Sequence, residues 1–173
     1  MDLEMIIGLM SDTHDNIPAL RKALKILMNH DINTVIHCGD FVSPFILKEI
    51  SSFPGKFIGV FGNNDGDKYL LLKIAEKNNI EIFTPPHVME LYGKRILVLH
   101  GFGPKDFTRK IVYELAESKN YDLIFYGHTH EREVKQIHGT LVVNPGEILG
   151  YLSGESTLAI VNLEKPCAKI VKI

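Results

Sequence analysis

Several residue types are scarce in this sequence, and their scarcity excludes several classes of protein. Tryptophan is absent, and the only cysteines are Cys38 and Cys167, neither of which belongs to a CxxC pair. Two such cysteines cannot make a disulfide framework. The sequence therefore predicts a protein of a reducing, intracellular compartment.

Long apolar runs and an excess of basic residues are missing as well. The apolar runs are short and fall far below the roughly 18–20 residues of a membrane span. The opening "MDLEMIIG" carries two acids and no basic region, so no signal peptide is expected and the predicted location is cytoplasmic. With 19 Lys and Arg against 21 Asp and Glu, the net charge is −2. This balance indicates neither nucleic acid nor an anionic membrane as a partner.

What is present indicates one globular domain over residues 1–173, with 45% apolar and 23% charged residues. In the first half, apolar runs alternate with segments of helical periodicity, which is typical of a parallel, buried sheet. Asn16 and Pro18 fit the start of the first helix. The predicted strands are 5–10, 34–38 and 56–61, and the predicted helices are 17–30, 44–52 and 67–78.

The second half contains more strands and tighter turns. Two hairpins are expected over 88–101 and 133–144, with turns near Tyr92-Gly93 and His138-Gly139. A helix over 106–118, a strand over 121–126 and strands over 156–163 and 167–173 complete the chain. The fold class is α/β, and two sheets packed face to face with helices outside would bury these apolar strands on both faces.

A compact polar signature follows five of the predicted strands. The five segments are SDTH at 11–14, GD at 39–40, GNND at 62–65, HG at 100–101 and GHTH at 127–130. In α/β sheets, ligands bind outside the carboxyl ends of the strands, so these segments are expected to converge. Their glycines allow the loop backbones to approach a shared centre closely.

The convergent side chains form a set of candidate metal ligands without any thiolate. They are Asp12, His14, Asp40, Asn63, His100, His128 and His130. Seven ligands exceed what one transition metal takes, and they suit two metals about 3.5–4 Å apart with one bridging carboxylate. Mixed oxygen and nitrogen donors favour Mn, Fe, Zn, Co or Ni over Ca or Mg.

Each motif taken alone has an ordinary structural explanation. A D-x-H segment is commonly a turn with a helix cap, and Gly-Asp after a strand is commonly a loop. A histidine before a glycine is commonly a satisfied core residue. The metal hypothesis depends on all five segments standing at strand ends together.

The motifs "SDTHDN", "HCGD", "GNND", "LHG" and "GHTH", in this order, resemble those of the calcineurin-like metallophosphoesterase superfamily. The short chain is similar to the small bacterial and archaeal phosphodiesterases, a subgroup to which the retromer scaffold subunit is also similar. "VNPGE" at 143–147 resembles the Asn-Pro-Gly segment of that subgroup. The resemblance implies a four-layer α-β-β-α sandwich of two mixed β-sheets, with two metals at the carboxyl ends of the strands.

The resemblance also implies how the ligands are shared. One metal would take Asp12, His14, Asp40 and His130, and the other would take Asp40, Asn63, His100 and His128. Asp40 would be the bridge. Outside this set, His37 could orient a ligand or simply pack in the core, and Lys105 and Arg109 could assist a phosphate or form a solvated helix face.

One position departs from the family pattern. Many members have histidine where this chain has Asn64, and that histidine contacts phosphate and can protonate the leaving oxygen. An amide donates a hydrogen bond but delivers no proton at neutral pH. Asn64 is therefore a candidate catalytic residue without general-acid capacity.

The sequence predicts a dinuclear-metal-dependent phosphodiesterase that hydrolyses small-molecule phosphodiesters by attack of a metal-bridging hydroxide. The cofactors would be two divalent transition metal ions, Mn above all, with Ni, Co, Fe or Zn as alternatives. Two other functions stay open: a phosphomonoesterase of small metabolites, and a non-catalytic scaffold that binds proteins. A homo-oligomer is compatible with the sequence, and the net charge argues only weakly against a nuclease.

Overall fold

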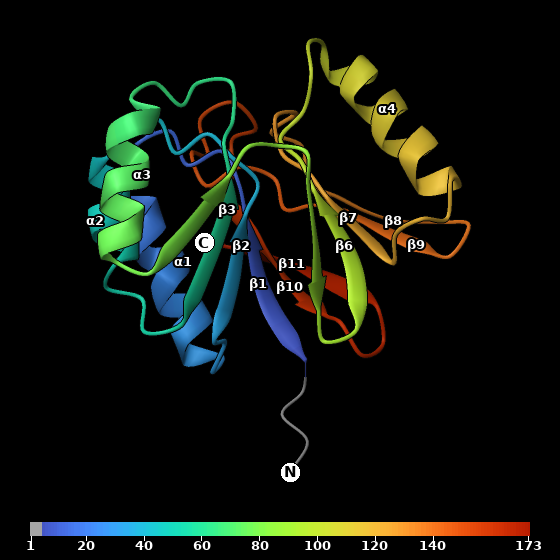
Figure 1. Cartoon of the computed structure of the whole chain (residues 1–173), viewed down its shortest axis with the longest axis horizontal. Helices are drawn as coiled ribbons and strands as arrows, with labels where there is room; N and C mark the ends of the chain where they lie inside the picture. Colours follow the sequence, from blue (N-terminus) through green and yellow to red (C-terminus); the bar gives the residue numbers. More distant parts are fainter. Residues whose placement is uncertain (1–4) are drawn as a thin grey trace.

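The computed structural model describes residues 5–173, which form two sheets covered by helices on their outer faces (Figure 1). The sequence-based prediction about a leader covers residues 1–8, of which 1–4 lie outside the described part. None of the helices within residues 5–173 has the length and apolar character that crossing a membrane requires.

The first sheet has six strands in the order β11-β10-β1-β2-β3-β4. Strands β1 to β4 run parallel, whereas β10 is antiparallel to β1 and β11 is antiparallel to β10. The bounds are Ile6–Met10 for β1, Thr34–His37 for β2, Lys56–Val60 for β3, Ile80–Phe83 for β4, Thr157–Asn162 for β10 and Cys167–Lys172 for β11.

The second sheet has five strands in the order β5-β6-β7-β9-β8. Strands β6, β7 and β9 are parallel, and β5 and β8 are antiparallel edge strands. The bounds are His87–Leu91 for β5, Lys94–Val98 for β6, Leu123–Phe125 for β7, Glu133–Ile137 for β8 and Thr140–Asn144 for β9. Both sheets are therefore mixed, as predicted.

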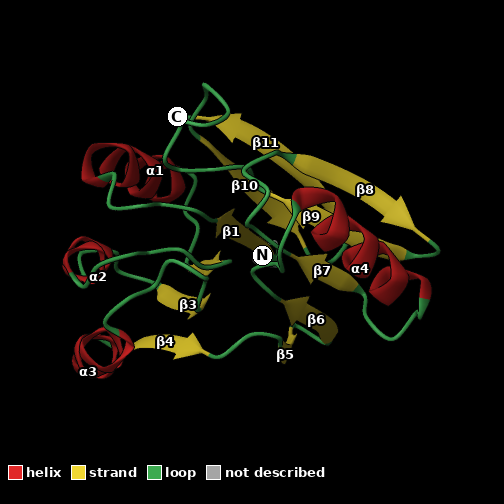
Figure 2. Ribbon diagram, turned by 90° about the horizontal axis from the view of Figure 1, so that it is seen from above, coloured by secondary structure: helices red, strands yellow, loops and turns green. Residues whose placement is uncertain are grey.

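Within the described residues, three helices pack on the first sheet and one packs on the second, on opposite sides of the molecule (Figure 2). They are α1 (Ile17–Asn29), α2 (Phe45–Ile50) and α3 (Lys68–Lys77) on the first sheet, and α4 (Lys105–Glu117) on the second. Helix α1 begins as predicted, because the Asn16 side chain accepts a hydrogen bond from the Ala19 amide at 3.2 Å.

Three apolar clusters separate the four layers. The central cluster joins the inner faces of the two sheets and includes Leu9, Ile36 and Phe125, all fully buried. A second cluster packs α1, α2 and α3 against the first sheet, and a third packs α4 against the second sheet. The predicted α-β-β-α sandwich is confirmed, and it explains why the strands are apolar on both faces.

Two features differ from the simplest interpretation of the sequence. Strand β4 was not predicted, because it is only four residues long and follows α3 after Asn78 and Asn79. Strands β10 and β11 come from the second half of the chain but extend the first sheet beyond β1. They turn a parallel sheet into a mixed one.

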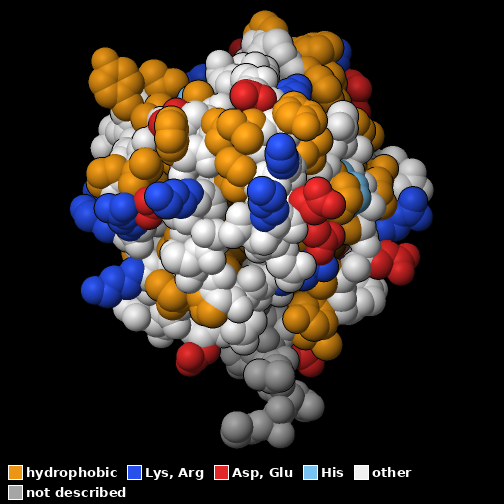
Figure 3. All heavy atoms as spheres, turned by 60° about the vertical axis from the view of Figure 1, so that its left-hand side comes forward, with side chains coloured by type: hydrophobic (Ala, Val, Ile, Leu, Met, Phe, Trp, Pro, Cys, Tyr) orange, Lys and Arg blue, Asp and Glu red, His pale blue; other side chains and the backbone are white. Residues whose placement is uncertain are grey.

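The face above α1, α2 and α3 mixes side chains of every kind (Figure 3). Lys and Arg alternate there with Asp and Glu, and apolar side chains such as Phe45 and Tyr69 are exposed.

Candidate metal centre

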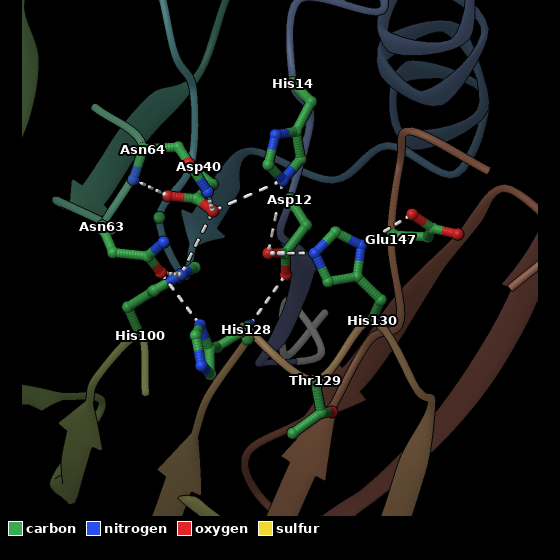
Figure 4. A network of polar contacts seen from close by, with 12 residues as sticks. Asp12, His14, Asp40, Asn63, Asn64, His100, His128, Thr129, His130 and Glu147 are labelled. Atoms are coloured by element: carbon green, nitrogen blue, oxygen red, sulfur yellow. Dashed lines mark hydrogen bonds and ion pairs between the residues drawn. The ribbon is translucent and has the colours of Figure 1, made fainter. Parts of the chain in front are cut away.

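The seven predicted ligands come from the carboxyl ends of five strands, and the sandwich brings these ends to one edge. Strands β1, β2 and β3 lie side by side in the first sheet, and β6 and β7 lie side by side in the second. Their loops meet at the top of Figure 1, between the helical layers. The side chains of all seven residues lie around one centre (Figure 4).

The backbone at the centre adopts an unusual conformation. Five of the seven candidate ligands have positive φ angles: Asp12 at 52°, His14 at 43°, Asp40 at 61°, His128 at 67° and His130 at 59°. Residues held in such sparsely populated regions cost about 1–3 kcal/mol each and cluster at functional sites. The fold thus maintains a strained arrangement that aims these side chains at one point.

Asp12, His14 and His130 form the first half of the centre. Asp12 Oδ1 lies 3.8 Å from His14 Nε2 and 3.4 Å from His130 Nε2. Asp12 Oδ2 accepts a hydrogen bond from the His128 amide at 3.0 Å, which ties the loop after β1 to the loop after β7. Among residues 5–173, Asp12 Oδ1 and His14 Nε2 are buried and have no hydrogen-bond partner.

Asp40 and His100 lie between this half and the next. Asp40 Oδ2 is 3.3 Å from His14 Nε2 and 3.3 Å from His100 Nε2, so one carboxylate oxygen faces both halves. His100 Nδ1 lies 2.7 Å from the carbonyl oxygen of Cys38. A carbonyl only accepts, so His100 donates from Nδ1, and its Nε2 presents a lone pair when the ring is neutral.

Asn63 and His128 complete the second half. Asn63 Oδ1 lies 2.9 Å from His100 Nε2 and 2.9 Å from His128 Nδ1. His128 Nε2 lies 2.6 Å from the carbonyl oxygen of Gly103, so its proton belongs on Nε2 and its lone pair on Nδ1. When both imidazoles are neutral, three lone pairs therefore face one another, an arrangement that a cation would stabilise.

The electrostatic field of the centre favours cations. Burial raises the pKa values of Asp12 and Asp40, but neighbouring imidazoles outweigh it, together with the Asn64 donors at Asp40, and both pKa values lie below their ordinary range. Burial lowers the pKa values of His14 and His100, yet the two carboxylates raise both above the ordinary value. The same negative field attracts metal ions, which must displace protons from these imidazoles.

The carboxylates and imidazoles of the centre are a suitable set of ligands for metal ions. Two groups of carboxylates and imidazoles have candidate ligand atoms within 4.8 Å of one another: Asp12, His14 and His130, and Asp12, Asp40 and His100. Asp12 belongs to both groups, whereas the resemblance implied Asp40 as the shared ligand. No thiolate joins the set, because Cys38 is fully buried and burial raises its pKa.

Two glycines allow the ligand loops to approach closely. A Cβ atom at Gly62 would lie 2.1 Å from Asp40 Oδ1, and one at Gly39 would lie 2.7 Å from His100 Nδ1. Gly39 also has a φ angle of +100°, which L side chains rarely adopt. The glycine that precedes the acid or the amide is therefore a steric requirement of the centre.

His37 and Asp65 hold the ligand loops in place. His37 Nδ1 accepts from the Gly39 amide at 3.1 Å, and its Nε2 lies 2.7 Å from Thr13 Oγ1, so the ring links the loops after β1 and β2. Asp65 accepts from the backbone amides of Gly62 and Val42 at 2.6 and 2.7 Å, which joins the loops after β2 and β3. His37 thus braces the ligand loops and also packs in the core against Phe41, so both roles that the sequence left open apply.

Asn64 lies at the exposed rim of the centre and contacts Asp40. Its side-chain Nδ2 donates to Asp40 Oδ2 at 2.7 Å, and its backbone amide donates to Asp40 Oδ1 at 2.8 Å.

Lys105 and Arg109, the two cations that could have assisted a phosphate, both pair with Glu131. The Lys105 pair measures 3.0 Å, so both cations are engaged within the protein.

Two cavities border the centre. One of about 380 Å³ is lined by His130, Arg132, Ser153 and neighbouring residues. The other, of about 240 Å³, is lined by Asn63, His100, Lys68 and neighbouring residues. A ligand at the centre would have space on either side for its substituents.

The segment 144–149 supports the centre in a way that sequence reasoning missed. Asn144 Nδ2 donates to the Gly127 carbonyl at 3.1 Å and to Thr129 Oγ1 at 3.0 Å, and so braces the loop after β7. Glu147 Oε2 lies 2.7 Å from His130 Nδ1. The "VNPGE" resemblance indicated that the segment matters, but nothing in the sequence paired Glu147 with an imidazole 17 positions away.

The chain is similar to known proteins over almost its whole length. The model of the calcineurin-like phosphoesterase superfamily domain matches residues 5–166. Phosphodiesterase MJ0936 of Methanocaldococcus jannaschii is 42% identical over 166 residues, which cover 93% of this chain and 95% of that protein.

Solved structures show the same relationship. A structure of an archaeal phosphodiesterase has a TM-score of 0.89 at 37% identity, over 98% of this chain and 100% of that chain. Vps29 of Entamoeba histolytica has a TM-score of 0.70 at 18% identity, over 98% of each chain, and shares the fold alone.

These matches confirm the predicted family, and they confirm the predicted enzyme class through homologues that are phosphodiesterases. The chain therefore belongs to the calcineurin-like phosphoesterase superfamily.

Proposed function

We propose that this chain is a phosphodiesterase that depends on two divalent transition metal ions. The observation that carries the proposal is the convergence of donor atoms, above all His100 Nε2 and His128 Nδ1, each 2.9 Å from Asn63 Oδ1. The 42% identity to an archaeal phosphodiesterase gives the class of substrate.

The proposed ligand partition follows the two halves of the centre. One position takes Asp12, His14, Asp40 and His130, and the other takes Asp40, Asn63, His100 and His128. The bridging role of Asp40 is supported by its Oδ2 atom, which stands 3.3 Å from an imidazole of each half. Four imidazoles beside two carboxylates suit divalent transition metals, and the family resemblance places Mn ahead of Ni, Co, Fe and Zn.

When bound, the metals would lower the pKa of water towards roughly 7 and neutralise charge on the phosphoryl oxygens. The side chains of this protein leave the nucleophile to the solvent. Ser11, Thr13 and Cys38 are fully buried, and the hydroxyl of Thr13 is engaged with His37. No hydroxyl or thiol of these three residues can reach a phosphorus atom at the rim.

Asn64 is proposed to hydrogen-bond a phosphoryl oxygen while it steadies Asp40. It has no proton to give to a leaving oxygen at neutral pH. An aryloxide leaves without protonation, whereas an alkoxide is a much stronger base. The enzyme should therefore prefer esters with good leaving groups.

A matrix of metals and substrates tests the function. Protein stripped with a chelator is reloaded with Mn, Ni, Co, Zn or Mg and assayed with an aryl diester, an aryl monoester and cyclic nucleotides. We expect aryl diester hydrolysis that requires added metal, with Mn giving the highest rate. Faster monoester hydrolysis would favour the phosphomonoesterase, and no hydrolysis with any metal would favour the scaffold.

Two variants separate the activity of this protein from contaminating phosphatases. Asp12→Ala removes a candidate ligand and should lower kcat by several orders of magnitude. His138→Gln changes an exposed histidine in the β8–β9 turn and should keep full activity.

Three features stay predictions: a cytoplasmic location, a single domain over 1–173 and a homo-oligomer. Cell fractionation, limited proteolysis and analytical ultracentrifugation, respectively, would test them.

A further inference from the structure

Glu147 is a fully buried carboxylate that the proposed chemistry does not use. It lies on the side of the His130 ring that faces away from Asp12, with its Oε2 atom 2.7 Å from Nδ1 of His130 (Figure 4). A buried charge is costly unless it is paired and hydrogen-bonded. Its position therefore calls for a specific role.

The structure holds this carboxylate rigidly from two sides. Glu147 Oε1 accepts from the backbone amide of Ser153 at 2.5 Å and from its hydroxyl at 2.7 Å. The next two amides, of Ile148 and Leu149, donate to the carbonyls of Ser11 and Asp12 at 3.0 Å each. Glu147 is thus tied both to its own loop and to the loop that carries Asp12.

The contact fixes where the proton of His130 resides. A carboxylate only accepts, so the imidazole donates from Nδ1 and its lone pair lies on Nε2. That lone pair is directed towards the centre, 3.4 Å from Asp12 Oδ1. His100 obtains the same tautomer from a neutral carbonyl, that of Cys38, so the anionic partner distinguishes His130.

We propose that Glu147 is a positioning residue for the metal ion on the His130 side of the centre. It locks the tautomer that exposes Nε2, and its charge makes that nitrogen a stronger donor. Such carboxylate–histidine contacts typically change metal affinity by about 10–100-fold. The proposal rests on the metal centre of the proposed function, and it adds a residue outside the predicted ligand set.

Two substitutions distinguish this role from simple packing. In Glu147→Gln, the single side-chain oxygen is drawn to the two donors of Ser153, which leaves the amide NH₂ facing His130. The imidazole must then accept at Nδ1 and carry its proton on Nε2, where the metal binds. In Glu147→Ala, His130 is free to adopt either tautomer, although the cavity destabilises the fold.

The proposal therefore expects opposite orders of effect in two measurements. Calorimetric titration of the chelator-stripped protein with Mn²⁺ should show weaker binding at one of two positions, by about 10–100-fold in Glu147→Gln and by less in Glu147→Ala. Urea unfolding should show the reverse order, with Glu147→Ala the less stable. Nitrogen-15 NMR of the imidazole should report protonation at Nδ1 in the unsubstituted protein and at Nε2 in Glu147→Gln.

Glu155→Gln is the matched control, because Glu155 follows Ser153 by two residues but pairs with Arg132 and Lys172. It should bind both metals within twofold of the unsubstituted protein. Unchanged binding in Glu147→Gln, or a larger loss in Glu147→Ala than in Glu147→Gln, would overturn the proposal. If the unsubstituted protein hydrolyses no ester and Glu147→Gln still weakens metal binding, the proposed function is refuted but the role of Glu147 in metal binding stands. Absence of metal binding in the unsubstituted protein would refute both.

Discussion

Replacing His37 with glutamine should make the stability of the protein less dependent on pH. Burial, the largest influence, lowers the pKa of His37 to about 3; the His100 and His14 imidazoles also lower it, whereas Asp12 and Asp40 raise it. The ordinary histidine pKa is about 6.5. The unfolded chain therefore binds a proton at mildly acidic pH that the folded protein excludes.

The size of the effect follows from these two pKa values. Stability decreases as the pH is lowered wherever the unfolded state binds more protons than the folded state. For His37 this range runs from near pH 6.5 down to the folded pKa of about 3. At about 1.4 kcal/mol per pH unit, His37 should cost the unsubstituted protein about 2 kcal/mol between pH 7 and pH 5. Glutamine does not titrate, so the variant escapes this loss.

The assay is urea unfolding of chelator-treated protein at pH 7 and pH 5. Glutamine can still reach Thr13 but loses the Gly39 contact and the stacking on Phe41, whose ring centroid is 4.0 Å away. The variant should thus be less stable at pH 7, and that deficit should shrink by about 2 kcal/mol at pH 5. Contributions of the other histidines cancel in the comparison.

The control for this experiment is His138→Gln, at the exposed turn between β8 and β9. Its effect on stability should be small and equal at the two pH values. A His37→Gln deficit that stays constant, or grows at pH 5, would show that His37 is protonated in the folded protein.

Three further predictions concern the centre itself. Asp40→Ala should lose both metals, because Asp40 Oδ2 faces an imidazole of each half at 3.3 Å, and full occupancy by elemental analysis would contradict the bridge. Gly62→Ala should cost about 1–3 kcal/mol in calorimetric unfolding, since its Cβ would lie 2.1 Å from Asp40 Oδ1, whereas Gly66→Ala meets no atom within 4 Å and serves as the control. Asn64→His should raise kcat/KM for alkyl esters more than for aryl esters with the same metal, and an unchanged ratio would assign leaving-group protonation to another group.

The order of helices and strands could be predicted from the sequence because its signals are local. Apolar periodicity and turn residues gave most elements to within a few residues, including both hairpins. Strand β4 escaped because its four residues, Ile80–Phe83, carry too short a pattern and pair on one edge only. The return of β10 to the first sheet escaped because pairing between distant strands leaves no local mark.

The sequence by itself determined which side chains are available to the centre. Polar residues at five strand ends stand out against apolar neighbours, and their chemical types limit the metals. Only the tertiary structure decided how these side chains meet. The contact from His128 to Asp12 spans 116 positions, and His100 takes its tautomer from a carbonyl 62 positions away. Such partners depend on how two sheets pack face to face. The directions of the lone pairs, the place of Asp40 Oδ2 between two imidazoles and the contact of Glu147 with His130 therefore exist only in the folded chain.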